Sequence, residues 1–244
     1  MTHLLIDADL LLYKAAIGSE FTCDWGGNNW VLSANLDQAM DTIQARIKGM
    51  KLHFNTSSFT MVRSDDKNFR SSLYPEYKGD RKLTRKPIIY TPLRDWVDDE
   101  YGCIHYANCE ADDTLGILHT QDPQADTIII SEDKDMLTVP GKLYRGGELI
   151  TVTPAMAHRY HMLQTLTGDA TDGYPGCPGM GPVSAEKALQ GAPETFWEVV
   201  VAAYTKKGLT EDDALLNARM AYILQHDDYR DGEVRLWEPP MSSK

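Results

Sequence analysis

The sequence predicts an α/β protein with a mainly parallel, twisted sheet flanked by helices, followed by a helical C-terminal part. Short apolar runs at residues 3–6, 59–63, 103–107 and 126–131 alternate with segments of helical spacing, an order typical of parallel sheets. Near residue 168 the composition changes to Gly, Pro and Asp. We therefore expect an α/β core at 1–168, and a hairpin with a helical region at 169–244 packed on that core.

The elements of the first half can be assigned in order. The first strand ends at Asp7, and a helix is expected from Ala8 to Ala16. Two tryptophans flank a Gly-Gly-Asn-Asn turn, which predicts a hairpin or ordered loop over 23–32. Apolar residues at helical spacing predict a helix over 35–51, before the strand at 59–63. Thr91 is expected to cap the next helix, and Gly102 to end it.

The second half continues the alternation. The expected elements are a strand at 103–107, a helix at 110–121, a strand at 126–131, a hairpin at 141–152 and a helix at 154–168. Beyond the Gly-rich stretch we expect helices at 183–190, 193–206 and 210–225, and a short strand at 233–237.

Charge and cysteine content limit the function classes. The net charge is −12, which taken alone argues against a nucleic-acid partner. Residues 63–86, the basic strip, nevertheless contain eight basic residues and only four acidic ones, which suits contact with phosphates. The N-terminus does not resemble a signal peptide and no apolar run suggests a membrane span. The four cysteines do not form a disulfide pattern, so we expect reduced thiols and a cytoplasmic protein without a membrane partner.

Acidic residues follow the predicted strands and tight loops more regularly than surface charge would. Each has an ordinary alternative role: Asp7 could cap a helix, and Asp169 and Asp172 could form turns. These roles do not explain two acidic clusters that directly follow two apolar strands, at 110–113 and 131–135. Crowded hard oxygen donors favour Mg²⁺ or Mn²⁺, and their number suggests two metals that hydrolyse a phosphodiester. The candidate ligands are Asp7, Asp65, Glu110, Asp112, Asp113, Asp133, Asp135, Asp169 and Asp172.

Two further segments could contact phosphates. Lys78 and Arg81 would share a face if their turn is helical, and could neutralise the scissile phosphate; alternatively they belong to a solvated basic face. The stretch Gly176–Pro182 leads into a helix, and its backbone amides could bind phosphate without reading sequence. The alternative for that stretch is a tight turn between helices.

These residues resemble the 5′-nuclease, or flap-endonuclease, superfamily. The similarity extends from about residue 3 to 190, through Asp7, Asn68-Phe69-Arg70, Tyr77-Lys78-Gly79-Asp80-Arg81, Glu110-Ala111-Asp112-Asp113 and Asp133-Lys134-Asp135. It continues through Thr167–Asp172 into the Gly-rich stretch, which looks like the family's helix–hairpin–helix. Within the superfamily the chain looks most like the compact 5′-exonucleases of lytic tailed phages. The implied core is PIN-like, and the implied activity is 5′→3′ hydrolysis of duplex DNA, flaps or RNA primers to give 5′-phosphates.

The resemblance also implies roles for individual residues. Asp7, Asp65, Glu110 and Asp112 would surround one metal, and Asp112 would be shared with a second metal held by Asp133, Asp135 and Asp172. Asp113 and Asp169 would act through water, and Lys78 with Arg81 matches the catalytic basic pair. The expected DNA contacts are Arg70, Lys82, Arg85, Lys86, Gly176, Gly179, Gly181, Ser184 and Lys187.

Several points stay open at this stage. The ligand at 65–66 could be either of two adjacent aspartates. K⁺ at the hairpin carbonyls, an RNA–DNA hybrid substrate, replication proteins as partners and a monomeric state in the phage's bacterial host are expectations of the same kind. The alternatives are an RNase H-type or PIN-type nuclease, which does not call for the Gly-rich hairpin, and a DNA-structure-binding protein without catalysis, which does not need every acid.

Overall fold

The computed structural model describes residues 1–79 and 84–240. Its main sheet has the strand order β4-β1-β5-β6-β7. All neighbours pair in parallel except β6 and β7, which form an antiparallel hairpin at the edge. The strands are β1 (His3–Asp7), β4 (Phe59–Val62), β5 (Thr127–Ile130), β6 (Gly141–Arg145) and β7 (Glu148–Val152). The predicted mainly parallel sheet is confirmed.

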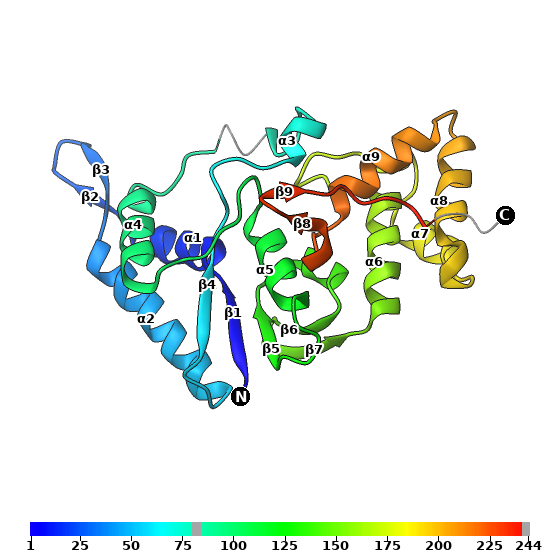
Figure 1. Cartoon of the computed structure of the whole chain (residues 1–244). Helices are drawn as coiled ribbons and strands as arrows, with labels where there is room; N and C mark the ends of the chain where they lie inside the picture. The colour runs from blue at the N-terminus through cyan, green and yellow to red at the C-terminus, as the bar shows by residue number, and fades with distance from the viewer. Residues whose placement is uncertain (80–83, 241–244) are drawn as a thin grey trace.

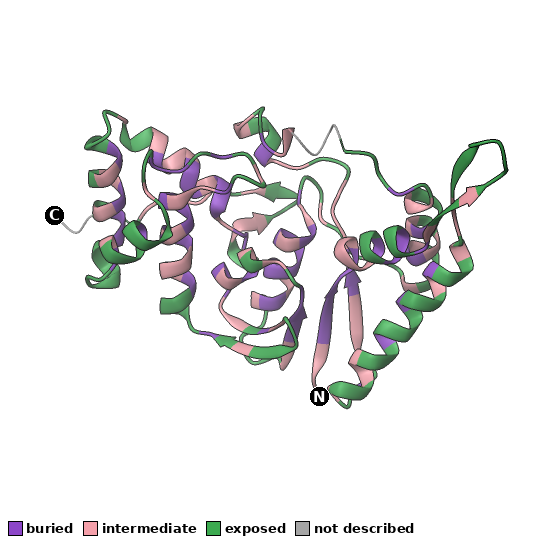
Figure 2. Ribbon diagram, turned by 180° about the vertical axis from the view of Figure 1, so that it is seen from behind, coloured by how far each residue is buried: buried purple, intermediate pink, exposed green. Residues whose placement is uncertain are grey.

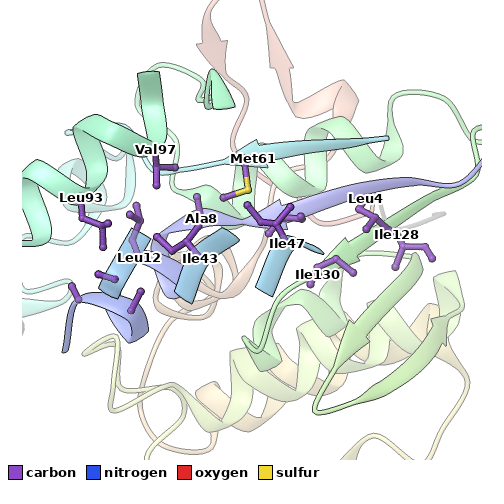
Figure 3. Close-up of a cluster of buried hydrophobic side chains, with 14 residues drawn as sticks. Leu4, Ala8, Leu12, Ile43, Ile47, Met61, Leu93, Val97, Ile128 and Ile130 are labelled. Atoms are coloured by element: carbon purple, nitrogen blue, oxygen red, sulfur yellow. The ribbon is translucent and has the colours of Figure 1, made fainter. Parts of the chain in front are cut away.

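Helices cover both faces of this sheet (Figure 1). One face packs against α1 (Ala8–Gly18), α2 (Leu36–His53) and α4 (Tyr90–Tyr101), and the other against α5 (Ala111–Thr120). Strand residues alternate between the faces: Leu4 and Ile6 lie in the first core, and Leu5 lies in the second. Figure 3 shows the first core, where Leu12 and Ile43 from the helices meet the strand side chains. Burial on both faces explains why the strands are continuous apolar runs.

The strand register brings three chain segments to one edge of the sheet. Asp7 pairs with Val62, and Ile6 pairs with Ile130. β1, β4 and β5 therefore end at the same level, and the residues that follow them emerge together. This edge is where open α/β sheets bind ligands.

Two predicted elements of the core differ in the structure. The strand expected at 103–107 is reduced to one isolated bridge between Val62 and Ile104, because the chain turns after Ile104 toward α5. Helix α4 begins at Tyr90 with Ile89 as its N-cap and no side-chain cap, so Thr91 lies inside the first turn. Gly102 ends α4 in the left-handed conformation, as predicted.

A two-stranded hairpin projects from the α1–α2 connection (Figure 1). It consists of β2 (Glu20–Asp24) and β3 (Trp30–Ala34), around a turn that contains Gly26 and Gly27 at positive φ. Trp25 and Trp30 are exposed on it. The hairpin predicted over 23–32 is thus present and slightly longer.

The C-terminal helices form a separate apolar cluster with α6 (Pro154–Thr167), which contributes Met162 and Leu166. Buried and exposed residues alternate along these helices in Figure 2. The cluster also contains residues of α7 (Pro182–Ala188), α8 (Phe196–Thr205) and α9 (Glu211–Ala221). The remaining described elements are short: α3 (Arg70–Leu73), η2 (Lys134–Thr138), η3 (Pro193–Thr195), η4 (His226–Asp228), β8 (Tyr229–Arg230) and β9 (Glu233–Val234). Helix α6, which precedes residue 168, packs against α7, α8 and α9, which follow it. The division into two regions at residue 168 stays a prediction.

Candidate active site

A cleft of about 520 Å³ opens where the parallel strands end. The cleft walls come from the starts of α1 and α5, the segments after β4 and β5, and the basic strip. Its lining combines the acidic residues Asp7, Asp9, Glu110, Asp112 and Asp133 with the basic residues Lys78, Arg85 and Lys86. The structure thus brings together Asp7, Glu110, Asp112 and Asp133 from the predicted ligand set.

Asp7 lies at the junction of β1 and α1. Its Oδ1 accepts a hydrogen bond from the Leu10 amide at 3.2 Å, and its Oδ2 accepts one from the Ser131 hydroxyl at 2.9 Å. The helix cap proposed as its ordinary role is therefore real. It does not exclude a second role, because burial, followed by repulsion from Asp9, raises the pKa of Asp7 to about 6.

Glu110 is the N-cap residue of α5 and is paired with cations of the basic strip. Its Oε1 lies 2.6 Å from the Lys78 Nζ, and its Oε2 accepts from the Tyr77 hydroxyl at 2.7 Å. Burial alone would raise the pKa of Glu110, but Lys78 and Arg70 lower it. Lys78 also lies 3.7 Å from Asp172, so it connects the first acidic cluster with the last.

Asp112 lines the cleft as a carboxyl group whose protonated form is favoured. Burial, followed by repulsion from Asp133 and Asp7, raises its pKa well above the usual range. Lys78 opposes this shift, and a cation bound in the cleft would stabilise the charged form further.

Asp133 and Asp135 follow β5: Asp133 is the N-cap of η2, and Asp135 lies in its first turn. The Asp133 Oδ1 accepts from the Asp135 amide at 2.8 Å, and the Asp135 Oδ1 accepts from Gln164 of α6 at 2.5 Å. Burial, followed by repulsion from Asp133, raises the pKa of Asp135 to about 7. Lys134 lowers the pKa of Asp135, whereas Asp172 and Asp169 raise it further, so the charges of the predicted second cluster act on one another.

Asp169 is held differently from the other members of this cluster. Its Oδ2 lies 2.5 Å from the Lys134 Nζ, and its Oδ1 accepts from the Thr171 amide at 2.7 Å. Burial opposes these contacts, which nevertheless lower the pKa of Asp169. Asp169 is therefore a member of the cluster whose charge the protein itself stabilises.

The donor chemistry of the cleft fits a hard divalent cation. Its central groups are carboxylates, and Asp7, Asp112 and Asp135 have pKa values that burial and mutual repulsion raise. Within residues 1–79 and 84–240, no three His, Cys, Asp or Glu side chains already close around one point as a metal cage. The ammonium of Lys78 instead lies against Glu110, and that of Lys134 against Asp169.

Two predicted site residues are in the wrong place for their expected roles. Asp113 is fully buried, and both of its oxygens accept from Arg70, at 2.6 and 2.8 Å. This pairing leaves Asp113 no oxygen directed at the cleft and leaves Arg70, with 1% of its surface exposed, unable to reach DNA. Asp113 was expected to act on metal through water, and Arg70 was expected to bind DNA. In the structure the two residues instead form a buried ion pair.

Asp65 is not among the residues that line this cleft. Its Oδ2 accepts from the Asn108 amide at 2.9 Å, which is the main reason that the pKa of Asp65 is lowered. The cleft is lined instead by its neighbour Ser64 and by Asp9, a residue that the sequence analysis missed. The available signal was the Asp-Ala-Asp spacing at the start of α1. Tyr77, Ser131 and Gln164 were also missed, since hydroxyl and amide residues carry no distinctive pattern.

The basic strip is only partly described. Arg85 lines the cleft and forms two 2.8 Å hydrogen bonds to Glu20 at the base of the β2–β3 hairpin. Lys86 also lines the cleft, with its ammonium 5.2 Å from the centre of the Tyr90 ring. The predicted catalytic residue Arg81 and the predicted DNA contact Lys82 lie outside the described residues.

The Gly-rich stretch is divided between core and surface. Gly176 is buried, and its amide donates to Asn217 at 2.9 Å, so the prediction that Gly176 contacts DNA is wrong. A Cβ at Gly176 would lie 2.2 Å from the Gly168 nitrogen, which explains why glycine is needed there. The remaining predicted contacts in this stretch are exposed: Gly179, Gly181, Ser184 and Lys187.

Comparison with known proteins agrees with this architecture. The family model for the N-terminal resolvase-like domain of 5′-3′ exonucleases matches residues 2–157. The exodeoxyribonuclease of Enterobacteria phage T3 is 29% identical, over 97% of this chain and 92% of its own length. The exonuclease of Escherichia phage T7 is 28% identical, over 97% of this chain and 93% of its own.

Solved structures show the same fold at lower identity. A flap endonuclease variant of bacteriophage T5, described as a pseudo-enzyme–product complex with DNA and metal ions, superposes with a TM-score of 0.67. It is 13% identical, and the match covers 91% of this chain and 89% of that one.

None of the helices in the described ranges is long and apolar enough to cross a membrane.

Proposed function

Because the chain belongs to the 5′-3′ exonuclease family, it is a phosphodiester hydrolase, and we propose that it acts from 5′ ends of duplex DNA with two divalent metals. The observation that carries this proposal is the group of carboxylates where the strands end: Asp7, Glu110, Asp112 and Asp133 line one cleft, and burial and mutual repulsion raise the pKa of Asp7 and Asp112. The phage relatives named as exonucleases align over nearly their whole length, which supports the same activity.

The two clusters suggest which residues would hold each metal. Asp7, Glu110 and Asp112 would hold the first, and Asp112 would be shared with a second held by Asp133, Asp135 and Asp172. Asp169, already paired with Lys134, would act through water. The chemistry supplied by a bound pair is a lower pKa of the attacking water and stabilisation of charge on the attacking and leaving oxygens. Mg²⁺ is the proposed ion, and Mn²⁺ would substitute for it.

Lys78 is the described cation best positioned to act on the substrate. Its ammonium lies against Glu110 and Asp172, and its backbone has φ of +53° with its amide bonded to the Asp172 carbonyl at 2.8 Å. We propose that this ammonium would turn from the carboxylates to a scissile phosphate bound in the cleft. Lys78 would then stabilise charge on the phosphate in the transition state. Arg81 is proposed as its companion.

The duplex would be held at two places. Arg85, Lys86 and Lys82 are proposed to contact the backbone near the cleft, and the exposed part of the Gly-rich stretch, Gly179 to Lys187, would hold the uncleaved duplex through amides and side chains. K⁺ at the carbonyls of that stretch is a further proposal. Such contacts are independent of sequence, as a general 5′ nuclease requires.

The wider setting is proposed from the phage relatives. We expect a monomer that acts in the bacterial host cytoplasm on blunt, nicked or flapped DNA, on RNA–DNA hybrids at primers, and beside replication proteins. Some members of the superfamily resembled here thread single-stranded 5′ ends through a long helical arch. Only 31 residues separate Lys78 from Glu110 in this chain, which leaves little length for such an arch and favours cleavage at duplex ends over cleavage of threaded flaps.

The deciding experiment is product mapping with the full chain. Duplexes that are blunt, nicked, gapped or flapped, with a deoxyribo- or ribonucleotide at the labelled 5′ end, would be incubated with Mg²⁺, Mn²⁺ or EDTA. We expect short 5′-phosphorylated products with either metal and none with EDTA. Cleavage in EDTA, or products from 3′ ends, would contradict the proposal.

A further inference from the structure

Gln164 of α6 contacts the second acidic cluster from inside the fold, with 4% of its surface exposed. Its Nε2 donates to the Asp135 Oδ1 at 2.5 Å. An ionised carboxylate only accepts hydrogen bonds, so the amide nitrogen has to face Asp135. The amide oxygen, Oε1, is thereby fixed as well, and within the described residues it is buried without a hydrogen-bond partner. Leaving a buried acceptor in this condition costs free energy of folding.

Tyr174 places a second polar group of this kind beside the same cluster. It pairs through its backbone with Asp169, in an isolated bridge with hydrogen bonds of 2.9 and 3.2 Å. Its side chain is buried, and its hydroxyl also has no partner in residues 1–79 and 84–240. Burial raises the pKa of this hydroxyl, and Asp135, Asp169 and Asp172 raise it further. The hydroxyl therefore lies within electrostatic reach of all three carboxylates.

Such unpartnered atoms are rare in the part of the chain that the structure describes. Apart from the Arg94 Nε, the buried side-chain nitrogen and oxygen atoms without a partner are the Gln164 Oε1 and the Tyr174 hydroxyl. The same half of the molecule satisfies other buried hydroxyls, since that of Tyr204 donates to the Thr165 carbonyl at 2.7 Å. Folded proteins pair nearly all buried polar groups, and the exceptions call for a specific explanation such as an ion or its water.

We infer that Gln164 and Tyr174 are positioning residues of the second metal; this rests on the two-metal function proposed above. Through its Nε2, Gln164 fixes the orientation of the candidate ligand Asp135. Its Oε1 can accept a hydrogen bond from water that accompanies the ion, and the Tyr174 hydroxyl can donate to the ligand carboxylates. Metal ligands are commonly oriented by such outer hydrogen bonds. Neither residue is assigned a contact with the substrate.

Phenylalanine at Tyr174 separates this role from a purely structural one. Tyr174→Phe removes an unpartnered hydroxyl, so in EDTA its urea midpoint should equal or exceed that of wild type. Tyr204→Phe is the matched control, because it removes a buried hydroxyl that is satisfied and should lower the midpoint. Binding of Mn²⁺ to the full-length proteins, followed by electron paramagnetic resonance, should show the reverse order. Tyr174→Phe should weaken one site about threefold or more, and Tyr204→Phe should leave both sites unchanged.

Gln164→Met tests the amide with little change of volume. It should weaken the same Mn²⁺ site about tenfold or more and raise the Mg²⁺ concentration that gives half-maximal cleavage. Thr165→Val is its control, because Thr165 is the next residue of α6 and is fully buried, with its hydroxyl bonded inside the helix to the His161 carbonyl. We expect Thr165→Val to keep both affinities within about twofold of wild type.

Asp135→Asn serves as the reference that identifies the second site. Mn²⁺ affinity at that site within about twofold of wild type, in either Gln164→Met or Tyr174→Phe, would overturn the inference. So would a Tyr174→Phe protein that unfolds in EDTA at a lower urea concentration than wild type, since its hydroxyl would then have a structural partner. If Asp135→Asn itself left Mn²⁺ binding and cleavage unchanged, the two-metal function would fall instead.

Discussion

Arg70 and Asp113 form a bidentate ion pair in the interior, with N–O distances of 2.6 and 2.8 Å and exposed fractions of 1% and 0%. The Arg70 guanidinium also donates to the carbonyls of Met220 and Tyr222. The Asp113 Oδ1 accepts from the Leu224 amide. The pair thus joins α3 and α5 to the end of α9 and stabilises the fold. Arg70 also donates to the Glu110 Oε2 at 3.1 Å, so the same pair helps to fix this carboxylate of the cleft.

Arg70→Met should therefore destabilise the protein strongly. Removing one partner of a buried pair leaves the other charge uncompensated, which costs about 3–5 kcal/mol. Urea unfolding followed by circular dichroism measures the loss. The control is Arg63→Met, because Arg63 forms a partly exposed pair with Asp98 whose loss should cost no more than about 1 kcal/mol. An Arg70→Met protein that unfolds like wild type but binds DNA weakly would return Arg70 to the DNA interface.

Asp112→Asn should abolish cleavage and leave DNA binding intact. The charge of Asp112 interacts with members of both acidic clusters. Asp133, Asp7 and Glu110 raise its pKa, and Lys78 lowers it. We expect the single-turnover rate to fall at least about 100-fold, the scale of losing one electrostatic group of a catalytic site. Rates on 5′-labelled duplex with Mg²⁺, and anisotropy with Ca²⁺, separate the two effects. Near wild-type cleavage would remove Asp112 from the site.

Lys78 and Lys86 should give opposite patterns. Lys78→Ala should lower the single-turnover rate by about 100-fold and change DNA affinity less than threefold, because Lys78 is proposed to act on the transition state. Lys86 lines the cleft with its ammonium over the Tyr90 ring and is proposed to contact the DNA backbone. Lys86→Ala should therefore weaken binding and leave the saturated rate nearly unchanged. Equal losses of rate and affinity in Lys78→Ala would reduce Lys78 to a phosphate contact.

The raised pKa of Asp135 predicts how stability depends on pH. Burial, followed by repulsion from Asp133, raises this pKa from 3.8 to about 7, so without metal the folded state favours the protonated form. The resulting penalty is small near pH 4 and grows until about pH 7. In EDTA, Asp135→Asn should gain about 1–3 kcal/mol over wild type between pH 4.5 and pH 7.5.

Thermal and urea unfolding of the two proteins at both pH values measures this gain. Comparing variant with wild type cancels His119 and His161, whose burial-lowered pKa values of about 4 give the opposite slope. With Mg²⁺ at pH 7.5 the order should reverse, because only wild type gains the full stabilisation of bound metal. An Asp135→Asn protein that is less stable than wild type in EDTA would show that this carboxylate is not under strain.

Local sequence was sufficient for the elements that build the site. Apolar runs that end abruptly at Asp7 and Ile130 identified two parallel strands, because strands buried on both faces must be continuously apolar. The family match over residues 2–157 agrees with the fold inferred in this way. The acidic groups at 110–113 and 133–135 followed from their position after strands.

The errors arose where orientation depends on distant residues. Asp65 and Ser64 are neighbours, and the contact with Asn108 decides which of them faces the cleft. Arg70 looked like part of a basic surface, but Met220, 150 positions along the chain, helps to bury it. Such contacts leave no periodic pattern, so spacing alone could not separate a DNA contact from a buried ion pair.

The two ends of the Gly-rich stretch should respond differently to alanine. Gly176 has φ of +65°, and an added Cβ would lie 2.2 Å from the Gly168 nitrogen and 2.5 Å from the Thr167 carbonyl carbon. Gly176→Ala should therefore cost at least about 2 kcal/mol through strain and a backbone clash. Gly181 has φ of −80° and open space around its Cβ position, so Gly181→Ala should cost less than about 1 kcal/mol.

For DNA affinity the order of the two variants should be reversed, so that Gly181→Ala has the larger effect. The new methyl group of Gly181→Ala would stand at the exposed start of α7, where duplex phosphates are proposed to approach, and should weaken duplex binding about three- to tenfold. Gly176→Ala, examined at a temperature where it stays folded, should bind nearly as wild type because its amide faces Asn217. Anisotropy with a labelled duplex in Ca²⁺ measures both affinities. Unchanged binding by Gly181→Ala would leave the stretch as a structural turn between α6 and α7.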